Sequence, residues 1–552
     1  MASAPEAEIP VVIVGGGPVG MMLAIDLARR GVRSALVNAE EATRRFPKGN
    51  THNSRTMEHY RRLGLSEAIR AVGLPPDHAT DVGYFTRLNG YELARLPMPS
   101  SREKLEAVRH SDTLDQIPEP IHRANQMYVE AILGAHVRTL TQVDLRFGWR
   151  CTEVTEEAEH VEARIEHANG RSELLRCRYL AGCDGGRSLV RRSLGIRFGG
   201  EVGLDQQFFG GTMISTHLRI PQLQARLAVE PCWQYWTVNP GVRIVLYPLD
   251  GADEFLIHTK PAACETGLDD EAIARLLREN VGADLELEIL GHGTWTAGQA
   301  LVADGFGSGR VLICGDSAHL FTPTGGFGMN TGIDDAANLA WKLAAAVGGW
   351  GGPRLPASYE GERRPIAIRN TSAAHRFSRN VGEVPMSPAI EEDSPEGEAA
   401  RRRAGEFLST FTEEFASIGI QLGARYDGSP LIVADGSSPP PDDPFVYTPS
   451  ASPGGRAPHF WMPDGSSLFD YLGRGFTLLC FGAPGDRAQR LGAAAARRGI
   501  PLELLEADGS EGRREFYERD HTLIRPDQHV AWRGDAVPDD ADELLDRVTG
   551  SA

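Results

Sequence analysis

The sequence predicts an α/β protein whose main parallel sheet is assembled from separated segments, with a second, β-rich domain inserted between them. Residues 11–40 contain two apolar runs around one amphipathic helix, the order of a strand–turn–helix–strand unit. Two further apolar runs end in Asp-Gly near residue 184 and in Gly-Asp near residue 316. Between these motifs, residues 81–97 and 207–259 alternate apolar and polar side chains, which is typical of strands.

The first unit carries three spaced glycines between its strand and its helix. Val11–Val14 is the strand, Gly15-x-Gly17-x-x-Gly20 follows, and the helix runs to about Arg30. We expect Gly15 to make the tight turn, Gly17 to admit a pyrophosphate and Gly20 to let the helix pack on the sheet. The helix N-terminus adds free N–H groups and partial positive charge. The spacing therefore predicts a dinucleotide site rather than a plain tight turn.

The residue expected at the ribose is not the usual carboxylate. Asn38 follows the second strand, Ser34–Val37, and Glu40 and Glu41 lie just beyond it. An asparagine side chain can bond a ribose hydroxyl as donor or acceptor, but it brings no charge. This motif alone leaves FAD and NAD open.

The second motif, Asp184-Gly185, ends a predicted strand and precedes a helix. Its carboxylate can approach a phosphate or a ribose, or it can cap the helix, which is a common use of aspartate. Both roles stay open at this point.

The third motif, Gly315-Asp316, ends a buried strand and leads through a glycine-rich loop into a helix at Ile333–Ala345. Ligands bind at this end of open α/β sheets, and the hydroxyls of a ribityl chain would supply donors to Asp316. The helix N-terminus suits the N1/O2 edge of an isoalloxazine, with a dipole effect of up to ~2 kcal/mol. The alternative, a flexible surface loop, is disfavoured by the many glycines and the proline between strand and helix.

Composition excludes several classes of protein. The net charge of −18 and the absence of a basic stripe argue against nucleic-acid binding. The charge-free stretch Ile9–Ile25 is too short and too rich in Gly and Pro to span a membrane, and the acidic N-terminus is not a secretory signal. The seven cysteines form no CxxC motif and no cluster with histidine. We expect a reduced, cytoplasmic protein without a metal site.

The C-terminal third continues with a helical segment, a linker and a last α/β domain. A helix is predicted at Pro395–Ile418, and its Arg401, Arg402 and Arg403 mark a solvated face; residues 437–455 are a Pro-rich linker. The last domain has predicted strands at Phe476–Phe481, Leu502–Leu505 and His529–Trp532 and an Ala-rich helix at Arg487–Arg498. The predicted boundaries are 1–80, 115–200 and 291–390 for the dinucleotide domain, 81–114 and 201–290 for the inserted sheet, 391–455 for helix and linker, and 456–552 for the last domain.

In combination these motifs resemble the class A flavoprotein aromatic hydroxylases, the family of p-hydroxybenzoate hydroxylase and phenol hydroxylase. The three motifs match that family's GxGxxG, DG and GD fingerprints in order and spacing. Further matches are Arg123-x-x-Gln126-x-x-x-Glu130, Tyr359-Glu360-x-x-Arg363-Arg364-Pro365 and the loop Lys48–Glu58, in which Lys48 stands where an arginine commonly touches the pyrophosphate.

The resemblance implies a Rossmann-like FAD-binding domain of the glutathione-reductase type, an inserted substrate-binding β-sheet and a thioredoxin-like C-terminal domain. That last domain holds only Cys480, so it is expected to be structural, covering the active site or forming a homodimer. The implied activity is hydroxylation of a phenolic or hydroxypyridine-type ring through a flavin C4a-hydroperoxide, with non-covalent FAD, NADH or NADPH, and O2. The alternatives are a related flavin enzyme, such as an epoxidase, a Baeyer–Villiger-type oxygenase on a polyketide-like substrate or a reductase, and a non-catalytic flavin-binding protein.

The candidate site residues follow from the motifs and the resemblance. Those expected at FAD are Gly15, Gly17, Pro18, Val19, Gly20, Asn38, Lys48, Arg123, Gln126, Asp184, Gly315, Asp316, Pro323, Gly326, Gly328, Met329 and Asn330. The catalytic candidates are His52, Asn50, Tyr235, Arg243 and Pro323, with Gln234 and His258 as further polar residues of the substrate sheet. His52 is the predicted substrate base, because imidazole titrates near neutral pH. Asn50 stands where phenol hydroxylase-type enzymes often place an acid. Ordinary packing is the alternative for each of these polar residues.

Overall fold

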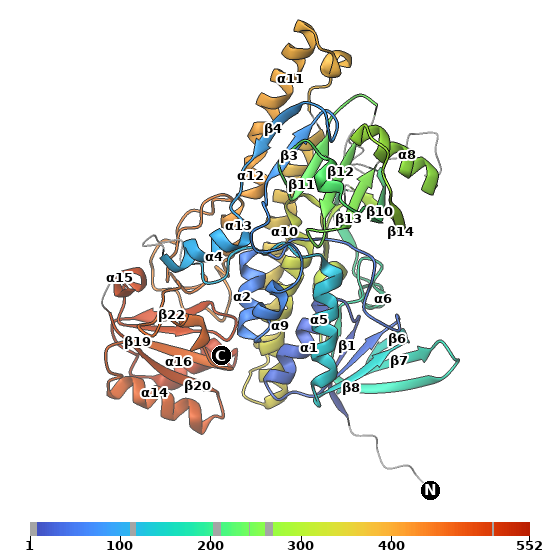
Figure 1. Ribbon diagram of the computed structural model, residues 1–552. Coiled ribbons are helices and arrows are strands. Elements are labelled where there is room, and N and C mark those ends of the chain that lie inside the picture. Colours follow the sequence, from blue (N-terminus) through green and yellow to red (C-terminus); the bar gives the residue numbers. More distant parts are fainter. Residues whose placement is uncertain are drawn as a thin grey trace.

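The computed structural model describes residues 8–110, 117–201, 211–241, 243–259, 269–297, 299–382, 384–509 and 513–552. Figure 1 shows the main sheet with β1 and β8 low in the view, an inserted sheet above it, and the C-terminal domain at the lower left. The candidate site is built where the first two of these parts meet.

The main sheet is assembled from three separate stretches of chain, as predicted. Its parallel centre has β1 between β8 and β2, with Val12 opposite both Ala35 and Leu180. Val11, Val12 and Ile13 are fully buried, and they share one hydrophobic core with α1 (Pro18–Arg29) and with side chains of the strands at 149–156 and 161–167. The path is β16 (Gly307–Ser308), β17 (Val311–Ile313), β8 (Ser172–Gly182), β1 (Ile9–Val14), β2 (Ser34–Asn38) and β5 (Val143–Phe147), with β6 (Trp149–Glu156) and β7 (Val161–His167) joined to β8.

Helices α1 (Pro18–Arg29), α5 (Gln126–Thr139) and α9 (Phe327–Gly348) pack beside this sheet. Helix α9 begins six residues earlier than the predicted Ile333, so the glycine-rich loop runs directly into its first turn. The apolar faces of α1 and α9 meet each other, which brings the first and third motifs together.

The inserted domain is a seven-stranded sheet that extends beyond the predicted boundary at residue 290. Its strands, in order across the sheet, are β14 (Glu288–Ala297), β10 (Gly211–Arg219), β13 (Glu254–Thr259), β12 (Ile244–Pro248), β11 (Gln234–Thr237), β3 (Val82–Phe85) and β4 (Glu92–Leu96). Helix α8 (Asp270–Val281) packs its Ile273 and Leu277 on one face of this sheet.

Strand register divides the side chains of this sheet between two faces. One row runs across it as Tyr84, Trp236, Val245, His258 and Ser215, and we call the face that carries this row the inner face. The opposite face carries Tyr235, Leu246 and Ile257, which pack with the side chains of α8. At the Trp236 end, Leu408 and Phe411 cover the inner face, whereas His258 is only half-buried.

The predicted helix at Pro395–Ile418 is interrupted. It forms α11 (Pro395–Leu408), a short 3-10 turn and α12 (Thr412–Phe415), and α13 (Ile418–Leu422) follows. Helix α11 lies close on β4, since a Cβ at Gly405 would come within 2.2 Å of the Leu93 carbonyl oxygen. This segment therefore lies over the inner face of the inserted sheet.

The C-terminal domain is a four-stranded mixed sheet with helices. Its order is β20 (Leu502–Ala507), β19 (Phe476–Phe481), β21 (His521–Ile524) and β22 (Val530–Gly534), with α14 (Asp486–Arg497), α15 (Arg513–Tyr517) and α16 (Ala541–Thr549). Strand β21 was not predicted, because it is only four residues long and begins with two polar residues, so it has no clear apolar alternation.

Buried ion pairs join this domain to the domain of the main sheet. Arg456 donates from Nε to Glu58 (3.0 Å), and Arg525 donates from both terminal nitrogens to the two oxygens of Glu362 (2.8 Å each). Arg525 and Glu362 are fully buried, and Lys342 donates a further hydrogen bond to Glu362 at 2.6 Å. A buried pair of this kind is costly to break, since either partner alone is an uncompensated charge.

Two kinds of feature are missing from the described part of the chain. None of its helices combines the length and apolar character needed to cross a bilayer. Within the same residues, no three histidine, cysteine or acidic side chains are grouped so that they could hold a metal ion.

Candidate flavin and substrate site

The three glycines of the first motif have different surroundings. Gly15 has φ +114°, and a Cβ there would lie 2.2 Å from the Cys183 carbonyl oxygen. A Cβ at Gly20 would lie 1.9 Å from the Gly15 carbonyl oxygen, so this glycine permits the close packing expected of it. A Cβ at Gly17 would meet nothing within 4 Å. Pro18 begins α1 directly after it, so open space lies before the helix N-terminus, where a pyrophosphate is expected.

Asn38 and Val19 hold the neighbouring loops together. The Asn38 side-chain oxygen accepts from the Gly16 N–H (3.1 Å), and its amide donates to the Glu40 carbonyl (3.1 Å). Val19 fills the space between α1, Gly315 and Gly332, because a Cβ at Gly332 would come 2.7 Å from it. Asn38 thus shapes the glycine loop, and its contact with a ribose remains a prediction.

Asp184 behaves as a capping residue. Its Oδ1 accepts from the hydroxyls of Ser188 (2.5 Å) and Ser317 (3.1 Å), and its Oδ2 accepts from the N–H groups of Leu189 (2.6 Å) and Val190 (3.2 Å). Both oxygens are engaged by the protein, so the prediction that this carboxylate binds FAD directly is not supported. Asp184 instead ties the second motif to the third.

Asp316, unlike Asp184, has a carboxylate that is open to solvent. Gly315, with φ +65°, donates its N–H to Asp335 Oδ2 (3.2 Å) and turns the chain, which leaves Asp316 exposed. Its carboxylate accepts no hydrogen bond from the residues that the structure describes. Lys48 is accessible but recessed: desolvation lowers the pKa of its ammonium, and the charge of Asp316 opposes that shift. An open acceptor and a nearby cation suit the hydroxyls and phosphates of FAD.

The glycine-rich loop between Pro323 and Asn330 is held by one buried amide. Gly325 and Gly326 have φ of +75° and +65°, a backbone that other residues rarely adopt. Asn330 accepts from the Asn53 N–H (3.0 Å) and donates to the carbonyls of Thr51 (3.0 Å) and Gly326 (2.6 Å). Pro323 is exposed on this loop, Gly328 lies beside Phe321, and Met329 packs partly on the core. The N-terminus of α9 is thereby clamped to the loop that precedes α2 (Ser54–Arg62).

Gln126 and Arg123 lie at the start of α5 and differ in orientation. The Gln126 N–H donates to the Gly49 carbonyl (2.7 Å), and its side chain donates to Glu130 (2.6 Å). Arg123 is buried, donates to the Thr51 hydroxyl (2.6 Å) and lies 3.4 Å above the Trp233 ring. Desolvation lowers the pKa of Arg123 to about 9. It thus joins the loop of Thr51 to the inserted sheet, and its contact with FAD remains a prediction.

The prediction of His52 as substrate base requires correction. His52 is fully buried, its Nδ1 lies 3.2 Å from the Tyr60 hydroxyl, and its Nε2 lies 3.2 Å from the Ala124 carbonyl oxygen. The carbonyl can only accept, so Nε2 carries the proton and Nδ1 accepts from Tyr60. Burial lowers the pKa of His52 to about 3. No ring nitrogen is left for a substrate, and His52 holds its loop in place.

Tyr235 also requires correction, because it lies on the face of the sheet that packs against α8. Its hydroxyl donates to Gln224 (2.6 Å) and accepts from the Cys232 N–H (2.8 Å), and its ring is 1% exposed. Alternation along the strand predicts that neighbours face opposite ways but not which face meets the flavin. Gln234 is buried and accepts from Trp236, whereas Asn50 and Arg243 are half-buried and stay predictions.

His258 is the polar residue at the open end of the inner face. Its Nδ1 lies 2.8 Å from the Ser215 hydroxyl, and the rings of Tyr247 and Trp295 stand edge-on to it at 5.3 and 5.5 Å. Burial lowers the pKa of His258 to about 4, so its imidazole is neutral at neutral pH. Tyr247, His258 and Trp295 are each half-buried, so a ring-shaped ligand can reach them.

Glu414 on α12 was not among the predicted site residues. Its Oε1 accepts from the Gly325 N–H of the glycine-rich loop (3.1 Å). Burial raises the pKa of Glu414 to about 7, opposed by that hydrogen bond and by Arg123. Its charge in turn contributes to the raised pKa values of Tyr84 and Tyr247 on the inner face. The sequence offered no motif here, because only tertiary packing brings α12 to the loop.

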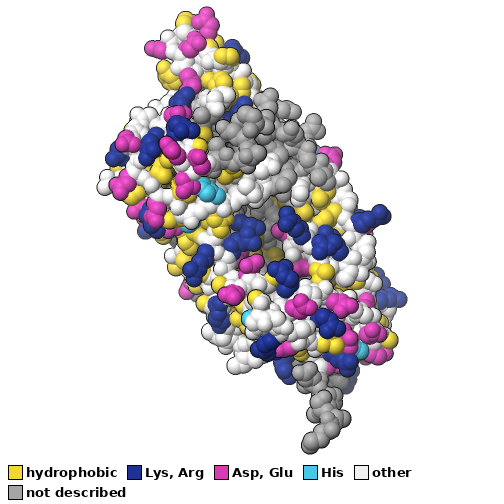
Figure 2. Space-filling view, turned by 90° about the vertical axis from the view of Figure 1, so that its right-hand side faces the viewer, with side chains coloured by type: hydrophobic (Ala, Val, Ile, Leu, Met, Phe, Trp, Pro, Cys, Tyr) yellow, Lys and Arg dark blue, Asp and Glu magenta, His cyan; other side chains and the backbone are white. Residues whose placement is uncertain are grey.

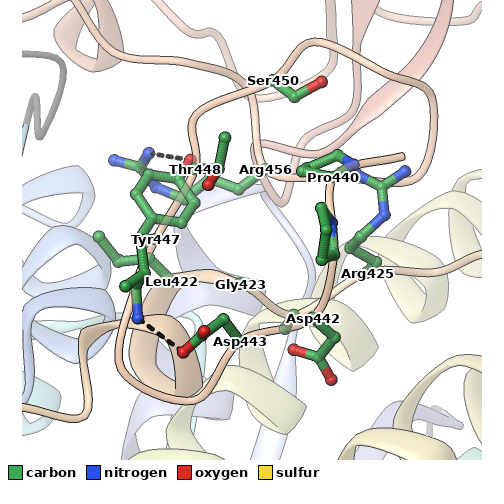
Figure 3. A pocket seen from close by; sticks show the side chains of 14 residues that line it. Leu422, Gly423, Arg425, Pro440, Asp442, Asp443, Tyr447, Thr448, Ser450 and Arg456 are labelled. Atoms are coloured by element: carbon green, nitrogen blue, oxygen red, sulfur yellow. Dashed lines mark hydrogen bonds between the residues drawn. The ribbon is translucent and has the colours of Figure 1, made fainter. Parts of the chain in front are cut away.

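Two cavities lie beside the segment that contains α12 and α13, and they differ in volume. A cavity of about 360 Å³ lies beside α12, between Thr412, Phe415 and Ala416 and the chain from Arg95 to Met98. The pocket in Figure 3 lies between α13 and the Pro-rich linker, where Arg456 donates to the Tyr447 hydroxyl (3.0 Å). It holds about 30 Å³, room for about one water molecule, so it is a packing gap. Figure 2 shows lysine and arginine side chains around a hollow at the middle of one face.

Two family models match the chain, "FAD binding domain" over residues 8–374 and "Aromatic-ring hydroxylase, C-terminal" over residues 450–552. A putative polyketide hydroxylase of Streptomyces halstedii is 31% identical over 95% of this chain and 93% of its own length. Phenol 2-monooxygenase of a Pseudomonas species is 29% identical over 98% of this chain and 93% of its own. The rebeccamycin biosynthetic enzyme RebC, solved with reduced flavin, superposes with a TM-score of 0.87 at 35% identity and 99% coverage of both chains. Together with the flavin motifs described above, these matches show that the chain belongs to the FAD-binding aromatic-ring hydroxylases, a family of flavin-dependent monooxygenases.

Proposed function

We propose that this protein hydroxylates a phenolic or hydroxypyridine-type ring, using FAD, NADH or NADPH, and O2. The observation that carries the proposal is that α12, in the segment that lies over the inner face of the inserted sheet, contacts the glycine-rich loop. Glu414 bonds Gly325 of that loop, and Arg123 spans from Thr51 to Trp233. A ring bound between the two would have the flavin loop on one side and aromatic side chains on the other.

The residues present fit FAD. Gly17 leaves room at the N-terminus of α1 for a pyrophosphate, Asp316 offers an open carboxylate for ribityl hydroxyls, and Lys48 adds a positive charge. The N-terminus of α9 follows the glycine-rich loop and favours negative charge near it, an effect of up to ~2 kcal/mol. FAD, when bound, takes electrons from the nicotinamide and passes them to O2.

The chain's own residues would bind the substrate and exclude water. Tyr247 and Trp295 present ring faces and edges to an aromatic ligand, and neutral His258 offers a polar contact for a ring hydroxyl. Aromatic walls keep water from the reacting atoms, which protects activated oxygen from wasteful decay.

A second candidate is oxygenation of a polyketide-like substrate by a related reaction, such as epoxidation or Baeyer–Villiger oxidation. The names of relatives support both substrate classes, since one is a phenol monooxygenase and another a polyketide hydroxylase. The choice between NADH and NADPH and the expected homodimer stay predictions.

The test is oxidation of NADH and NADPH by the FAD-loaded enzyme over a panel of phenols, hydroxypyridines and multi-ring hydroxyaromatics, with products identified under heavy-isotope O2. Stimulated nicotinamide oxidation and one labelled hydroxyl in the product are expected. A protein that cannot be loaded with FAD would contradict the proposal, as would oxygen that comes from water. An epoxide or ester product would favour the second candidate.

A further inference from the structure

We infer that Glu414 is the catalytic base that takes the proton from the substrate's ring hydroxyl, a role that rests on the proposed function. The observation is geometric: a single turn of helix, α12, places one carboxyl against the glycine-rich loop. Its Oε1 accepts from the Gly325 N–H at 3.1 Å, and no described residue hydrogen-bonds its second oxygen, which leaves that oxygen available to a bound ring. Glu414 is half-buried, and its charge acts on Tyr84 and Tyr247 of the inner face, so the carboxyl lies between the glycine-rich loop and that face.

Of the titratable groups around the Glu414 carboxyl, none is suited to accept the substrate's proton near neutral pH. Among the described residues, Arg123, Tyr84 and Tyr247 are the ionisable groups that act on Glu414 or on which it acts. Burial raises the pKa of both tyrosines, so neither takes up a proton or loses one near neutral pH. Arg123 stacks on Trp233 and stays cationic, which favours the ionised carboxylate that a base requires.

His258 is the competing acceptor, and it is the weaker of the two. The pKa of Glu414 is raised to about 7, whereas that of His258 is lowered to about 4. Burial raises the pKa of the carboxyl and lowers that of the imidazole, so Glu414 is the stronger proton acceptor of the two. His258 is left as a neutral hydrogen-bonding partner for the substrate.

The step moves one proton and no electrons. The hydroxyl O–H bond of the substrate breaks, an O–H bond forms on Glu414, and the negative charge passes from the carboxylate to the ring oxygen. The ring carbons ortho and para to that oxygen become more nucleophilic, which suits attack on electrophilic oxygen.

The test compares Glu414→Gln with Glu406→Gln in the FAD-loaded enzyme. Glutamine keeps an oxygen for the Gly325 N–H but accepts no proton, and Glu406 is an exposed residue of α11. With 1-naphthol as probe, we expect Glu414→Gln to hydroxylate about 10²–10⁴-fold more slowly and to divert NADPH oxidation to hydrogen peroxide. The FAD affinity of Glu414→Gln should stay within about threefold of that of Glu406→Gln. Glu414→Asp should restore part of the hydroxylation rate.

The pH profile separates this role from a structural one. Below pH 7 the carboxyl is protonated and inactive as a base, so wild-type hydroxylation should rise between about pH 6 and pH 8. Glu414→Gln should lose that rise, and its infrared spectrum should lose a carboxyl band that titrates over the same range. An unchanged rate and profile would overturn the inference, as would tighter FAD binding, which would mean that Glu414 occupies the place of the flavin ring. If the wild type hydroxylates no phenol, the proposed function itself fails.

Discussion

Two sets of polar side chains surround the flavin motifs, and their hydrogen bonds separate them. One set is hydrogen-bonded to other residues of the protein and holds the loops in place: Asp184, Asn330 and His52. Asp316 is left with an open carboxylate, and Gly17 with open space. Because buried polar groups must be paired, the satisfied set is scaffold and the open set is available to a ligand.

Gly17→Val should abolish FAD binding without unfolding the protein. The new side chain enters space that is empty around Gly17 and that we assign to the pyrophosphate. Flavin absorbance after reconstitution and the thermal unfolding midpoint are the two measurements. The matched variant is Gly20→Ala, whose Cβ would lie 1.9 Å from the Gly15 carbonyl, so it should destabilise the fold itself. A yellow Gly17→Val protein with wild-type affinity would contradict the assignment.

Asp316→Ala should weaken FAD binding by about 10- to 150-fold, because hydrogen bonds to a charged group are each worth about 1.5–3 kcal/mol. Its unfolding free energy without FAD should change little, since the carboxylate is exposed. Asp184→Ala should do the reverse and mainly lower stability, because four donors lose their acceptor. FAD titration and chemical unfolding of both variants measure the two effects. Equal losses of FAD affinity would mean that Asp184 also contacts the flavin.

At the scale of secondary-structure elements, the site depends on which face of a sheet and which turn of a helix meet the flavin loop. The strands β11 and β12 each alternate, so Tyr235 packs against the α8 side while Tyr247 lies on the inner face. Helix α12 is only one turn long, yet it brings Glu414 to Gly325.

Two tyrosine variants test this assignment of faces. Tyr247→Leu should raise the KM for an aromatic substrate about tenfold, because it removes a ring from the accessible part of the inner face. Tyr235→Phe should leave KM unchanged but lower the unfolding free energy by about 1–3 kcal/mol, since the Cys232 N–H and Gln224 lose a buried partner. Steady-state kinetics and urea unfolding give both values; a larger KM effect at Tyr235 would reverse the faces.

Elements with a local signal could be predicted from the sequence, whereas the contacts between them could not. The strand at Phe476–Phe481 and the order of the first three elements match the structure, because apolar period and glycine spacing are local properties. His52 was misplaced because a motif-matched loop does not reveal that both ring nitrogens find partners at Tyr60 and Ala124. Glu414 was missed because its neighbour Gly325 is 89 residues away in the chain.

For the molecule as a whole, the C-terminal domain is bound through charges buried in the FAD-binding part. Arg525 and Arg456 meet Glu362 and Glu58, and these four side chains are sealed from solvent. Cys480, by contrast, is a buried strand residue whose pKa is raised to about 11 by burial, so its thiol is unreactive.

Arg525→Met should lower the unfolding free energy by about 3–5 kcal/mol, because Glu362 and Asp527 would be left with a buried charge in excess. Thermal and urea unfolding, monitored by circular dichroism, measure the loss. Cys480→Ser, in the same domain, tests the thiol separately, and its turnover should stay within a few-fold of wild type. If Arg525→Met were as stable as wild type, the ion pairs would not be what holds the domains together.

The position of these arginines in the chain also has a consequence for biosynthesis. Translation proceeds from the N-terminus, so Glu58 and Glu362 leave the ribosome well before Arg456 and Arg525, respectively, can reach them. Before Arg525 is made, Glu362 has Lys342 as a partner but lacks the two hydrogen bonds that the arginine donates. The hydrogen bonding of these two carboxylates is therefore completed only when the C-terminal domain has been made and docks.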